Sequence, residues 1–367
     1  MTKTGAQVLD VLVATPGGGV GQGGIDRMMA ALRTEAERQG QPDLRIQFAA
    51  SRGLGHIGFS ILHMSVFIVR MLALRLAGRL DVLHLNLAIQ GSTWRKLILA
   101  SIAHGMGVPY VLHLHGAEYQ EYWTDAPSRR NRAIGWLFAH AGRIIVLGTI
   151  WEQFVTSRIP EIGSRVLIVP NAAPRPVLAH RGGGNQVHIL FLGRIGDRKG
   201  VPQLGAALAR MQGDPGWRAT IAGDGNVEAA RVAARQAGLA DRVDIPGWVG
   251  PEQVAELIAN ADIMVLPSFH ENLPISVIEA MAAGLAVVAT PVGAVEDIIT
   301  NEVNGLLVPP GDVDALTLAL QRLVADPALR ARLGKAALEV HRARLDMAPY
   351  LGAITDAWRG AARHSTH

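Results

Sequence analysis

Two cations follow an apolar, β-branched run at a point where a parallel strand would end. The run VHILFLG stops at Gly193, and Arg194 and Lys199 come next, before the helical pattern VPQLGAALARM. Gly193 allows a tight turn, and the amino end of the helix lies beneath the two cations. Such an arrangement suits a bound diphosphate. The alternative, that both are solvated surface charges, stays open on this segment alone.

Two glutamates, with seven residues between them, follow a later strand in the segment LPSFHENLPISVIEAMAAG. Glu271 falls in the loop after the strand. Glu279 falls inside a helix that we expect to begin near Pro274 and to end near Gly284. A loop carboxylate can accept hydrogen bonds from sugar hydroxyls, and a helix carboxylate can accept them from a ribose diol. The alternatives are a helix-dipole partner and an exposed helix face.

A glycine-rich loop after the first apolar run contains the spacing of a dinucleotide-binding turn. Gly19, Gly21 and Gly24 spell G-x-G-x-x-G within TPGGGVGQGGIDR. Such sites normally carry an acid at the end of the next strand, whereas LRIQFAA is followed by Ser51 and Arg52. An arginine there could accept a 2′-phosphate, so an NADP-dependent oxidoreductase remains an alternative. The loop is nevertheless longer than a tight pyrophosphate turn.

Metal ligation receives little support from the sequence. The chain has no cysteine, so any ligands would be His, Asp or Glu. Asp312-Val-Asp314 spells an Asp-x-Asp pattern, but it stands at the start of the helical segment ALTLALQRL, where Asp is an ordinary helix cap. We therefore predict no metal site and no bound cofactor.

Strand and helix patterns alternate along the whole chain, which predicts βαβ units and parallel sheets. The Pro- and Gly-rich stretch AAPRPVLAHRGGGNQ separates two such series. We predict an α/β protein of two facing, doubly wound Rossmann-like domains, residues 1–174 and 175–346. A helix in residues 347–367 is expected to pack back on the first domain.

Composition narrows the classes of function. The chain has 367 residues, 49% hydrophobic and 18% charged, which is typical of a folded protein of two domains. Residues 1–174 contain 17 Lys and Arg against 11 Asp and Glu. This excess favours an anionic partner such as a phospholipid surface or a phosphorylated acceptor. A nucleic acid partner is not expected, because no basic run carries interleaved aromatics.

The N-terminus lacks the pattern of a signal peptide, so we expect a cytoplasmic protein. The most apolar stretch, residues 56–80, is interrupted by His63, Arg70 and Arg75. It therefore lacks the run of about 20 consecutive apolar residues that a membrane-spanning helix needs. We expect a buried amphipathic helix against the sheet. The alternative is a helix with one face on the inner surface of the plasma membrane.

Several segments together resemble one family. The second half resembles the donor-binding domain of family 4 retaining glycosyltransferases of the GT-B fold. Its matching segments occur in the family's order: FLGRIGDRKG, IAGDG, DIPGWV, FHENLPISVIEAMAAGLAVVATPVG, EDII and NGLLVPPGD. The first half resembles the acceptor domain of those members that extend lipid-linked oligosaccharides in exopolysaccharide assembly. The segments that carry this resemblance are GGIDR, DVLHLNLAIQGSTWRK, VPYVLHLHGAEY and VPNAAP. The resemblance covers nearly the whole chain.

The resemblance implies a role for each matching residue. Arg194 and Lys199 would hold the donor diphosphate, Glu271 would contact the transferred sugar, and Glu279 would bind the ribose. His115, in HLHG, would lie near the donor sugar and join Arg194, Lys199 and Glu271 as a catalytic residue. The donor-binding set that it implies is Gly23, Gly24, Gly193, Arg194, Lys199, Glu271, Asn272, Leu273 and Glu279.

Three features of the sequence qualify this assignment. Strand alternation puts His113 on the same face as His115, so one of the two histidines could be structural. The family often has Ser after the fifth strand, whereas this chain has Gly148 followed by Thr149. Its second motif usually reads Glu-Gly, whereas Asn272-Leu273 follows Glu271 here, a departure that bears on the choice of sugar.

The implied reaction transfers a hexose, with retention and without a metal, from a nucleotide diphosphate sugar to a polyprenyl-diphosphate saccharide or a glycan. GDP-mannose is the favoured donor and a UDP-sugar the next. The resemblance implies front-face attack through an oxocarbenium-like state. The alternatives are a nucleotide-sugar epimerase of the same fold, the NADP-dependent oxidoreductase, and a non-enzymatic scaffold on a membrane surface.

Overall fold

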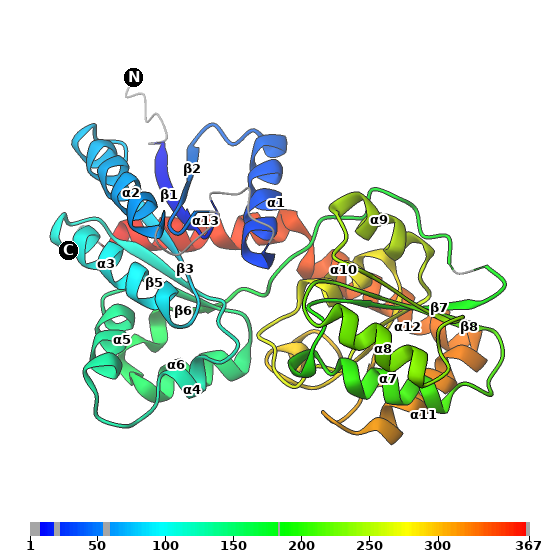
Figure 1. Cartoon of the computed structure of the whole chain (residues 1–367). Coiled ribbons are helices and arrows are strands. Elements are labelled where there is room, and N and C mark those ends of the chain that lie inside the picture. Colours follow the sequence, from blue (N-terminus) through cyan, green and yellow to red (C-terminus); the bar gives the residue numbers. More distant parts are fainter. Residues whose placement is uncertain (1–7, 18–22, 54–58, 183, 365–367) are drawn as a thin grey trace. The chain divides into compact units, whose positions relative to one another are not determined.

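The computed structural model describes residues 8–17, 23–53, 59–182 and 184–364. The chain divides into two compact units, one formed by Met1–Pro170 with Met347–His367 and one by Asn171–Asp346. In the described part of each unit, six parallel strands form one sheet with helices packed against it (Figure 1). The α/β class and the two Rossmann-like units agree with the prediction. The first unit ends at Pro170, slightly before the predicted boundary at residue 174.

The first sheet has the strand order β2-β1-β3-β4-β5-β6. The chain passes outward from β1 to β2 and then crosses back to β3, so its direction of winding reverses between β1 and β3. Apart from Leu9, the apolar residues of these two central strands are buried, as expected for a parallel sheet covered on both faces. The elements are β1 (Leu9–Thr15), α1 (Gly24–Gln39), β2 (Leu44–Ala50), α2 (Phe59–Leu76), β3 (Val82–Leu87), α3 (Gly91–Gly105), β4 (Tyr110–Leu114), α4 (Tyr119–Tyr122), α5 (Arg129–Ala139), β5 (Arg143–Val146), α6 (Thr149–Arg158) and β6 (Val166–Ile168).

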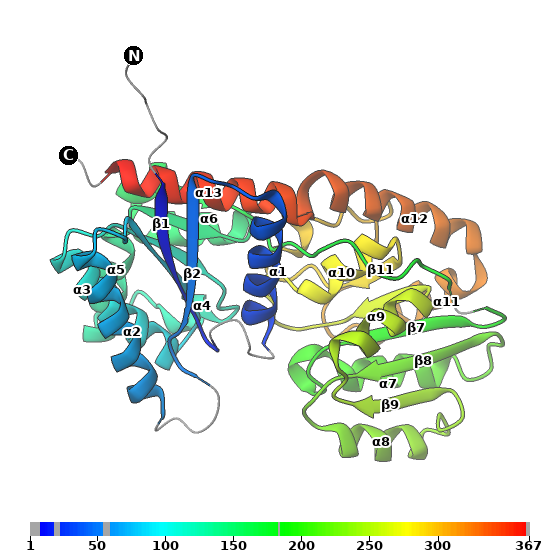
Figure 2. The same ribbon diagram turned by 90° about the horizontal axis from the view of Figure 1, so that it is seen from above.

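The final helix, α13 (Met347–His364), completes the first unit although it follows the second in sequence. It packs against α1, β3, β4 and β5, beside α1 in Figure 2. Trp358 of α13 is fully buried, and its Nε1 donates a hydrogen bond to Nδ1 of His84 at 2.9 Å. Helix α13 therefore covers apolar surface of the first sheet beside α1.

The second sheet has the order β12-β11-β10-β7-β8-β9, so the winding reverses between β7 and β10. Right-handed crossovers place α7 and α8 on one face and α9 and α10 on the other. The elements are β7 (Val187–Leu192), α7 (Val201–Arg210), β8 (Trp217–Ala222), α8 (Val227–Gln236), β9 (Val243–Gly247), α9 (Pro251–Asn260), β10 (Ile263–Leu266), α10 (Ile275–Ala283), β11 (Ala286–Ala289), β12 (Leu306–Leu307), α11 (Val313–Ala325) and α12 (Pro327–Val340).

Helix α2 departs from the expectation of a buried amphipathic helix. Met64, Phe67 and Met71 are buried in the first unit, as predicted, but apolar side chains also cover the opposite face, which is exposed. The sequence pattern could not separate these two faces, because both are apolar. No helix within the described residues is both long enough and apolar enough to cross a membrane.

Candidate functional site

The reversal of winding in the second unit brings two loops together. In open parallel sheets, a crevice forms beyond the carboxyl ends of the strands where the winding reverses. Here those strands are β7 and β10, which are hydrogen-bonded neighbours. The loop after β7 carries Arg194 and Lys199, and the loop after β10 carries Glu271. The topology therefore brings the predicted cations and the first predicted glutamate to one edge of the sheet.

Close backbone contacts lock these loops to each other. Gly200 adopts a φ of 69°, and a Cβ at this position would lie 2.0 Å from the carbonyl oxygen of Pro267. The backbone N–H of Phe269 donates to the carbonyl of Arg198 at 2.9 Å. Glycine is required at residue 200 both for its backbone conformation and for this close approach. Lys199, the preceding residue, is thereby held near the loop that follows β10.

Lys199 and Glu271 form a buried ion pair between Nζ and Oε1. Their side chains are only 14% and 8% exposed. Ser268 Oγ donates a second hydrogen bond to the same carboxylate oxygen at 2.7 Å, and Thr290 Oγ1 donates to the Ser268 carbonyl at 2.6 Å. A buried charge is stable only when it is paired and hydrogen-bonded. This cluster meets that condition, and the ammonium keeps further N–H groups that could bind an anion.

Arg194 lies in the same loop but faces a different environment. Its guanidinium is 3.6 Å from the Asp224 carboxylate, and both side chains are more than half exposed. The preceding Gly193 donates its N–H to Ala222 at 3.1 Å, which joins the loop to the end of β8. A Cβ at Gly223 would lie 1.8 Å from the Gly193 oxygen, so this approach depends on glycine. Arg194 is therefore an exposed cation at the surface, whereas Lys199 is half-buried and held by its ion pair with Glu271.

The residues after Glu271 are buried and position the start of α10. The Asn272 carbonyl accepts from Ala294 N–H at 2.7 Å, and the Leu273 carbonyl accepts from Asn171 Nδ2 at 2.8 Å. The sequence did not predict this role of Asn171, although the motif VPNAAP contains it. Helix α10 begins after Pro274 and ends at a left-handed Gly284, as predicted, and half-buried Glu279 lies in its second turn.

In the first unit, His115 follows β4 at the carboxyl edge of the sheet. Its Nε2 lies 2.8 Å from Asn86 Oδ1, while Asn86 Nδ2 donates to the Ala14 carbonyl at 3.2 Å. Because the amide nitrogen of Asn86 is already a donor, its oxygen accepts, and Nε2 of His115 carries the hydrogen. Nδ1 then has a free lone pair that can accept a hydrogen bond from a hydroxyl.

His115 belongs to a group of three neighbouring imidazoles. Its ring lies against that of His113, with centroids 4.0 Å apart, and His113 contacts His84 at 5.4 Å. Burial, with a smaller effect from the neighbouring His84 and Lys96, lowers the pKa of His115 to about 3. Burial also lowers the pKa of His84 to about 4 and that of His113 well below its usual range. All three rings are therefore neutral at pH 7.

Lys96 is a second feature of this edge that the sequence did not single out. It is 1% exposed, and its Nζ donates to Ser51 Oγ at 2.6 Å, while Ser51 Oγ donates to the Thr15 carbonyl at 2.9 Å. Burial and the nearby Arg95 lower the pKa of Lys96 to about 7, partly offset by Asp26. Lysine is rarely buried so completely. The fixed Ser51–Lys96 contact occupies the strand end where a dinucleotide site would place a ribose-binding carboxylate.

The glycine-rich loop is only partly described. Gly19 and Gly21 lie outside the described residues, Gly23 caps α1 with an extended backbone, and Gly24 is the first helical residue. Asp26 Oδ1 accepts from Gly17 N–H at 2.9 Å, which links the two ends of the loop. The predicted donor residues Gly23 and Gly24 thus lie at the amino end of α1.

Two other predicted positions have local structural roles. Gly148 is the N-cap of α6, and Thr149 is its exposed first residue. Asp312 caps α11 as predicted, with Oδ1 accepting from Ala315 N–H at 2.9 Å, while Asp314 pairs with Arg210.

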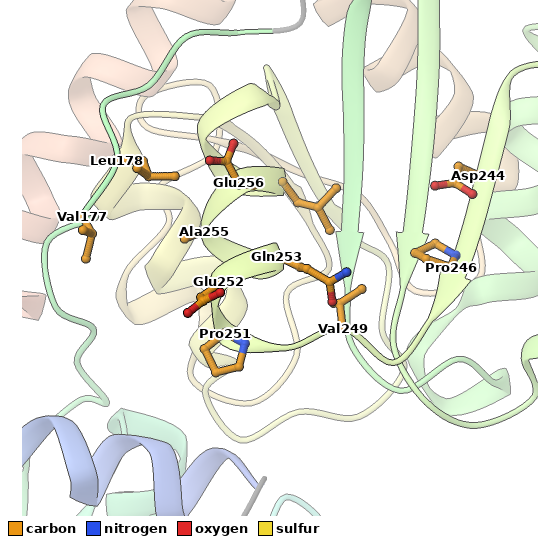
Figure 3. Close-up of a pocket in the computed structure, with 11 residues that line it drawn as sticks. Val177, Leu178, Asp244, Pro246, Val249, Pro251, Glu252, Gln253, Ala255 and Glu256 are labelled. Atoms are coloured by element: carbon orange, nitrogen blue, oxygen red, sulfur yellow. The ribbon is translucent and has the colours of Figure 1, made fainter.

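A separate cavity of about 850 Å³ lies beside α9 (Figure 3). Helix α9 stands between the segment with Val177 and Leu178 and the end of β9, with Glu252 and Glu256 toward the first and Gln253 toward the second. None of the predicted donor residues lines this cavity. We therefore do not assign it to the Lys199–Glu271 site.

Comparison with known proteins places both units. The family described as "Glycosyl transferase 4-like domain" matches residues 3–172, and that described as "Glycosyl transferases group 1" matches residues 179–340. The 2-deoxystreptamine N-acetyl-D-glucosaminyltransferase of Streptomyces fradiae is 29% identical over 89% of this chain and 80% of its own. The 2-deoxystreptamine glucosyltransferase of Streptomyces kanamyceticus is 30% identical over 76% and 77%.

Solved structures share the fold at low identity. Sucrose-phosphate synthase from Thermosynechococcus elongatus superimposes with a TM-score of 0.79 at 20% identity, covering 96% of this chain and 98% of that one. HepE of Anabaena in complex with UDP-glucose gives 0.74 at 17% identity, covering 95% and 99%. Both matches extend over nearly all of each chain, and at this identity they establish the fold alone.

Proposed function

We propose, from the premise that this chain belongs to the family 4 glycosyltransferases of the GT-B fold, that it is a retaining, metal-independent hexosyltransferase. The chain is a glycosyltransferase that uses a sugar nucleotide. The observation that carries the more specific proposal is the Lys199–Glu271 pair, fixed by Ser268 at the reversal of the second sheet. A cation is held there where a diphosphate would bind, and a carboxylate lies beside it.

In this proposal Lys199 and Arg194 bind the donor diphosphate, with Gly193 shaping the loop. As the bond from the sugar C1 to the diphosphate oxygen breaks, negative charge grows on that oxygen, and the two cations stabilise it. Lys199 can bind phosphate and still keep Glu271, because an ammonium has three donors. The exposed Arg194 is able to move from Asp224 onto the donor. Glu271 accepts hydrogen bonds from the transferred sugar, and Glu279 binds the ribose.

His115 takes part as a neutral group. With Nε2–H fixed by Asn86, its Nδ1 accepts a hydrogen bond from a hydroxyl of the transferred sugar. The incoming hydroxyl of the acceptor forms the new bond to C1 on the same face, and its proton passes to the departing diphosphate. Retention follows from attack and departure on one face of an oxocarbenium-like sugar. Gly23 and Gly24 would offer backbone N–H groups to a phosphate.

GDP-mannose is the donor that we propose first, on the resemblance to exopolysaccharide mannosyltransferases. A UDP-sugar is the second candidate; HepE, which shares the fold, was solved in complex with UDP-glucose. The proposed acceptor is a polyprenyl-diphosphate saccharide or a growing polysaccharide, at the inner face of the plasma membrane. The likeness to a putative colanic acid biosynthesis glycosyltransferase of Escherichia coli, 29% identical over 62% of this chain, supports such an acceptor.

The epimerase and oxidoreductase alternatives are not favoured. Both family matches describe glycosyltransferases. At the end of β2, where a dinucleotide site would carry a ribose-binding carboxylate, the Ser51 hydroxyl contacts Lys96 instead. The oxidoreductase gives Arg194, Lys199, Glu271 and Glu279 no common role. An epimerase would share the donor site and would turn over the nucleotide sugar without an acceptor.

The test is turnover of one sugar nucleotide at a time by the purified full chain in EDTA. GDP-mannose, UDP-glucose, UDP-galactose and UDP-GlcNAc would each be supplied with and without a polyprenyl-diphosphate saccharide, and the anomer of the product would be read by NMR. We expect the sugar of one donor to be transferred with retention. Lys335→Ala, which changes an exposed lysine of α12 and is the control for Lys199→Ala, should be as active as the parent. Absence of nucleotide release from every donor, together with NADPH binding, would overturn the proposal.

A further inference from the structure

The outer face of α2 is apolar and open. Six large side chains on this face are between 40% and 89% exposed: Ile61, Leu62, Val66, Val69, Leu72 and Leu76. At 3.6 residues per turn they fall on one side of the helix, opposite the buried Met64, Phe67 and Met71. A helix that is apolar on every side is normally covered on every side. We call these six residues the α2 face.

Positive charge accompanies the α2 face. Residues 44–80 contain five arginines and no aspartate or glutamate. On the helical wheel Arg70 and Arg75 border opposite sides of the face, and Arg79 follows the helix. Arg70 also donates to Gln47 at 2.9 Å, whereas Arg75 and Arg79 form no ion pair with any residue that the structure describes. An apolar strip bordered by cations matches the interface of an anionic bilayer, where acyl chains lie beneath phosphate groups.

Helix α3 carries further exposed apolar side chains. It lies next to α2 on the same side of the first sheet in both views (Figures 1 and 2). Trp94 and Ile98 of α3 are 46% and 49% exposed. Tryptophan is enriched where proteins meet the headgroup layer of a membrane. The exposed apolar residues of the first unit are therefore concentrated on two neighbouring helices, and isolated exposed side chains alone would need no explanation.

We propose that the α2 face, with Trp94 and Ile98, rests on the surface of an anionic phospholipid bilayer. A second copy of this chain fits less well, because a symmetric contact would bring like-charged arginines together with no carboxylate on α2 to pair them. The inference rests on the proposed function in one respect, that a lipid-linked acceptor gives the docking a purpose.

The position of α2 connects docking to the site of the first unit. The helix follows β2, so its first turns lie toward the carboxyl edge that carries Ser51, Lys96 and His115. A Cβ at Gly53, just after β2, would lie 2.0 Å from the His63 ring in the second turn of α2. Docking through α2 would thus bring this edge of the sheet near the headgroups, where the diphosphate of a polyprenyl-linked acceptor resides.

The experiment is sedimentation of the full chain with vesicles of phosphatidylcholine, alone or with about 30% phosphatidylglycerol. Leu62→Glu with Val69→Glu tests the face, and Arg75→Ala with Arg79→Ala tests the charge. The matched control is Leu318→Glu with Val303→Glu, two exposed apolar residues of the second unit. Donor hydrolysis without acceptor is measured on each variant as a check that its fold and its donor site are intact.

We expect binding to the anionic vesicles that falls about tenfold or more in the α2-face variant. Each arginine removed should weaken vesicle binding about fivefold, and high salt should abolish this difference. The control variant should bind like the parent. Donor hydrolysis should persist throughout. Weak binding of the parent, or equal binding of the α2-face variant, would overturn the inference. So would a dimer of the parent that this variant dissociates. Vesicle binding without turnover of any donor would instead remove the proposed reaction and leave the docking.

Discussion

The carboxyl edges of the two sheets share a topology and differ in electrostatics. Each edge has a reversal of winding, between β1 and β3 in the first unit and between β7 and β10 in the second. The second unit holds a charged pair there, Lys199 and Glu271, with Ser268 as a further donor. The first unit holds neutral imidazoles at His113 and His115. It also holds Lys96, whose Nζ donates a hydrogen bond to the Ser51 hydroxyl.

This difference separates two kinds of task. A group that must stabilise a growing negative charge has to remain charged while buried, which requires an adjacent partner. A group that orients hydroxyls of a sugar works as a neutral acceptor, and burial is then enough to keep it neutral. The same fold therefore supports two environments, and each can be disrupted independently.

The largest expected effect is loss of the charged pair. Lys199→Ala should lower kcat/KM by about 10³-fold, because it removes a cation from the leaving diphosphate. It should also destabilise the second unit by about 1–3 kcal/mol, because the buried Glu271 carboxylate loses its ion partner. Steady-state kinetics and urea unfolding would measure the two effects.

A double variant separates these two consequences. Lys199→Met with Glu271→Gln should recover most of the stability and none of the activity, since no buried charge remains. Recovery of activity in the double variant would show that the pair is structural and would remove the contrast between the two edges.

The neutral edge should respond to acid instead. An imidazole with a lowered pKa in the folded state contributes stability that is complete above its unfolded pKa of about 6.5 and is lost as the pH falls toward the folded value. For His84, whose folded pKa is about 4, the loss amounts to about 3 kcal/mol. Urea unfolding between pH 7.5 and 4.5 should therefore show steadily falling stability.

Replacing one member of the group tests this cause. His115→Gln should reduce the pH dependence of the unfolding free energy by up to one proton, because burial lowers the pKa of His115 in the folded protein. An unchanged slope in His115→Gln would mean that His115 binds protons equally in the folded and the unfolded protein. Burial would then not hold the ring neutral, and the proposed acceptor role would lose its basis.

Two glycine substitutions complete the series, and the smallest expected effect is that at Gly205. Gly200→Ala should lower stability by about 1–3 kcal/mol and weaken donor binding, since Cβ would meet the Pro267 carbonyl and the backbone conformation is left-handed. Gly205→Ala, within α7 and with no atom within 4 Å of its Cβ, should raise stability by about 0.5–1 kcal/mol. Calorimetry and nucleotide titration would measure both. Normal donor binding in Gly200→Ala would show that the two loops need not be locked together.

Local sequence signals predicted much of the architecture. Apolar runs predicted β7 and β10, and the Pro274 and Gly284 signals predicted the limits of α10, because caps and β-branched runs act over a few residues. The same is true of Asp312, whose capping bond needs only the next three residues. Asn171 and Lys96 were missed because their partners, Leu273 and Ser51, are distant in sequence. Ser268 lies only three residues from Glu271, but its hydrogen bond depends on the folded shape of the buried loop.

The sequence by itself therefore determined the alternation of strands and helices, the two windings and the residue types after each strand. The tertiary structure decided which of those residues meet. Only the reversal between β7 and β10 and the close approach at Gly200 bring Lys199 to Glu271, and only burial beside β1, β3 and β4 makes the imidazoles neutral. Exposure of the α2 face was likewise decided by packing, because a chain sequence gives the polarity of a helix face and not what covers it.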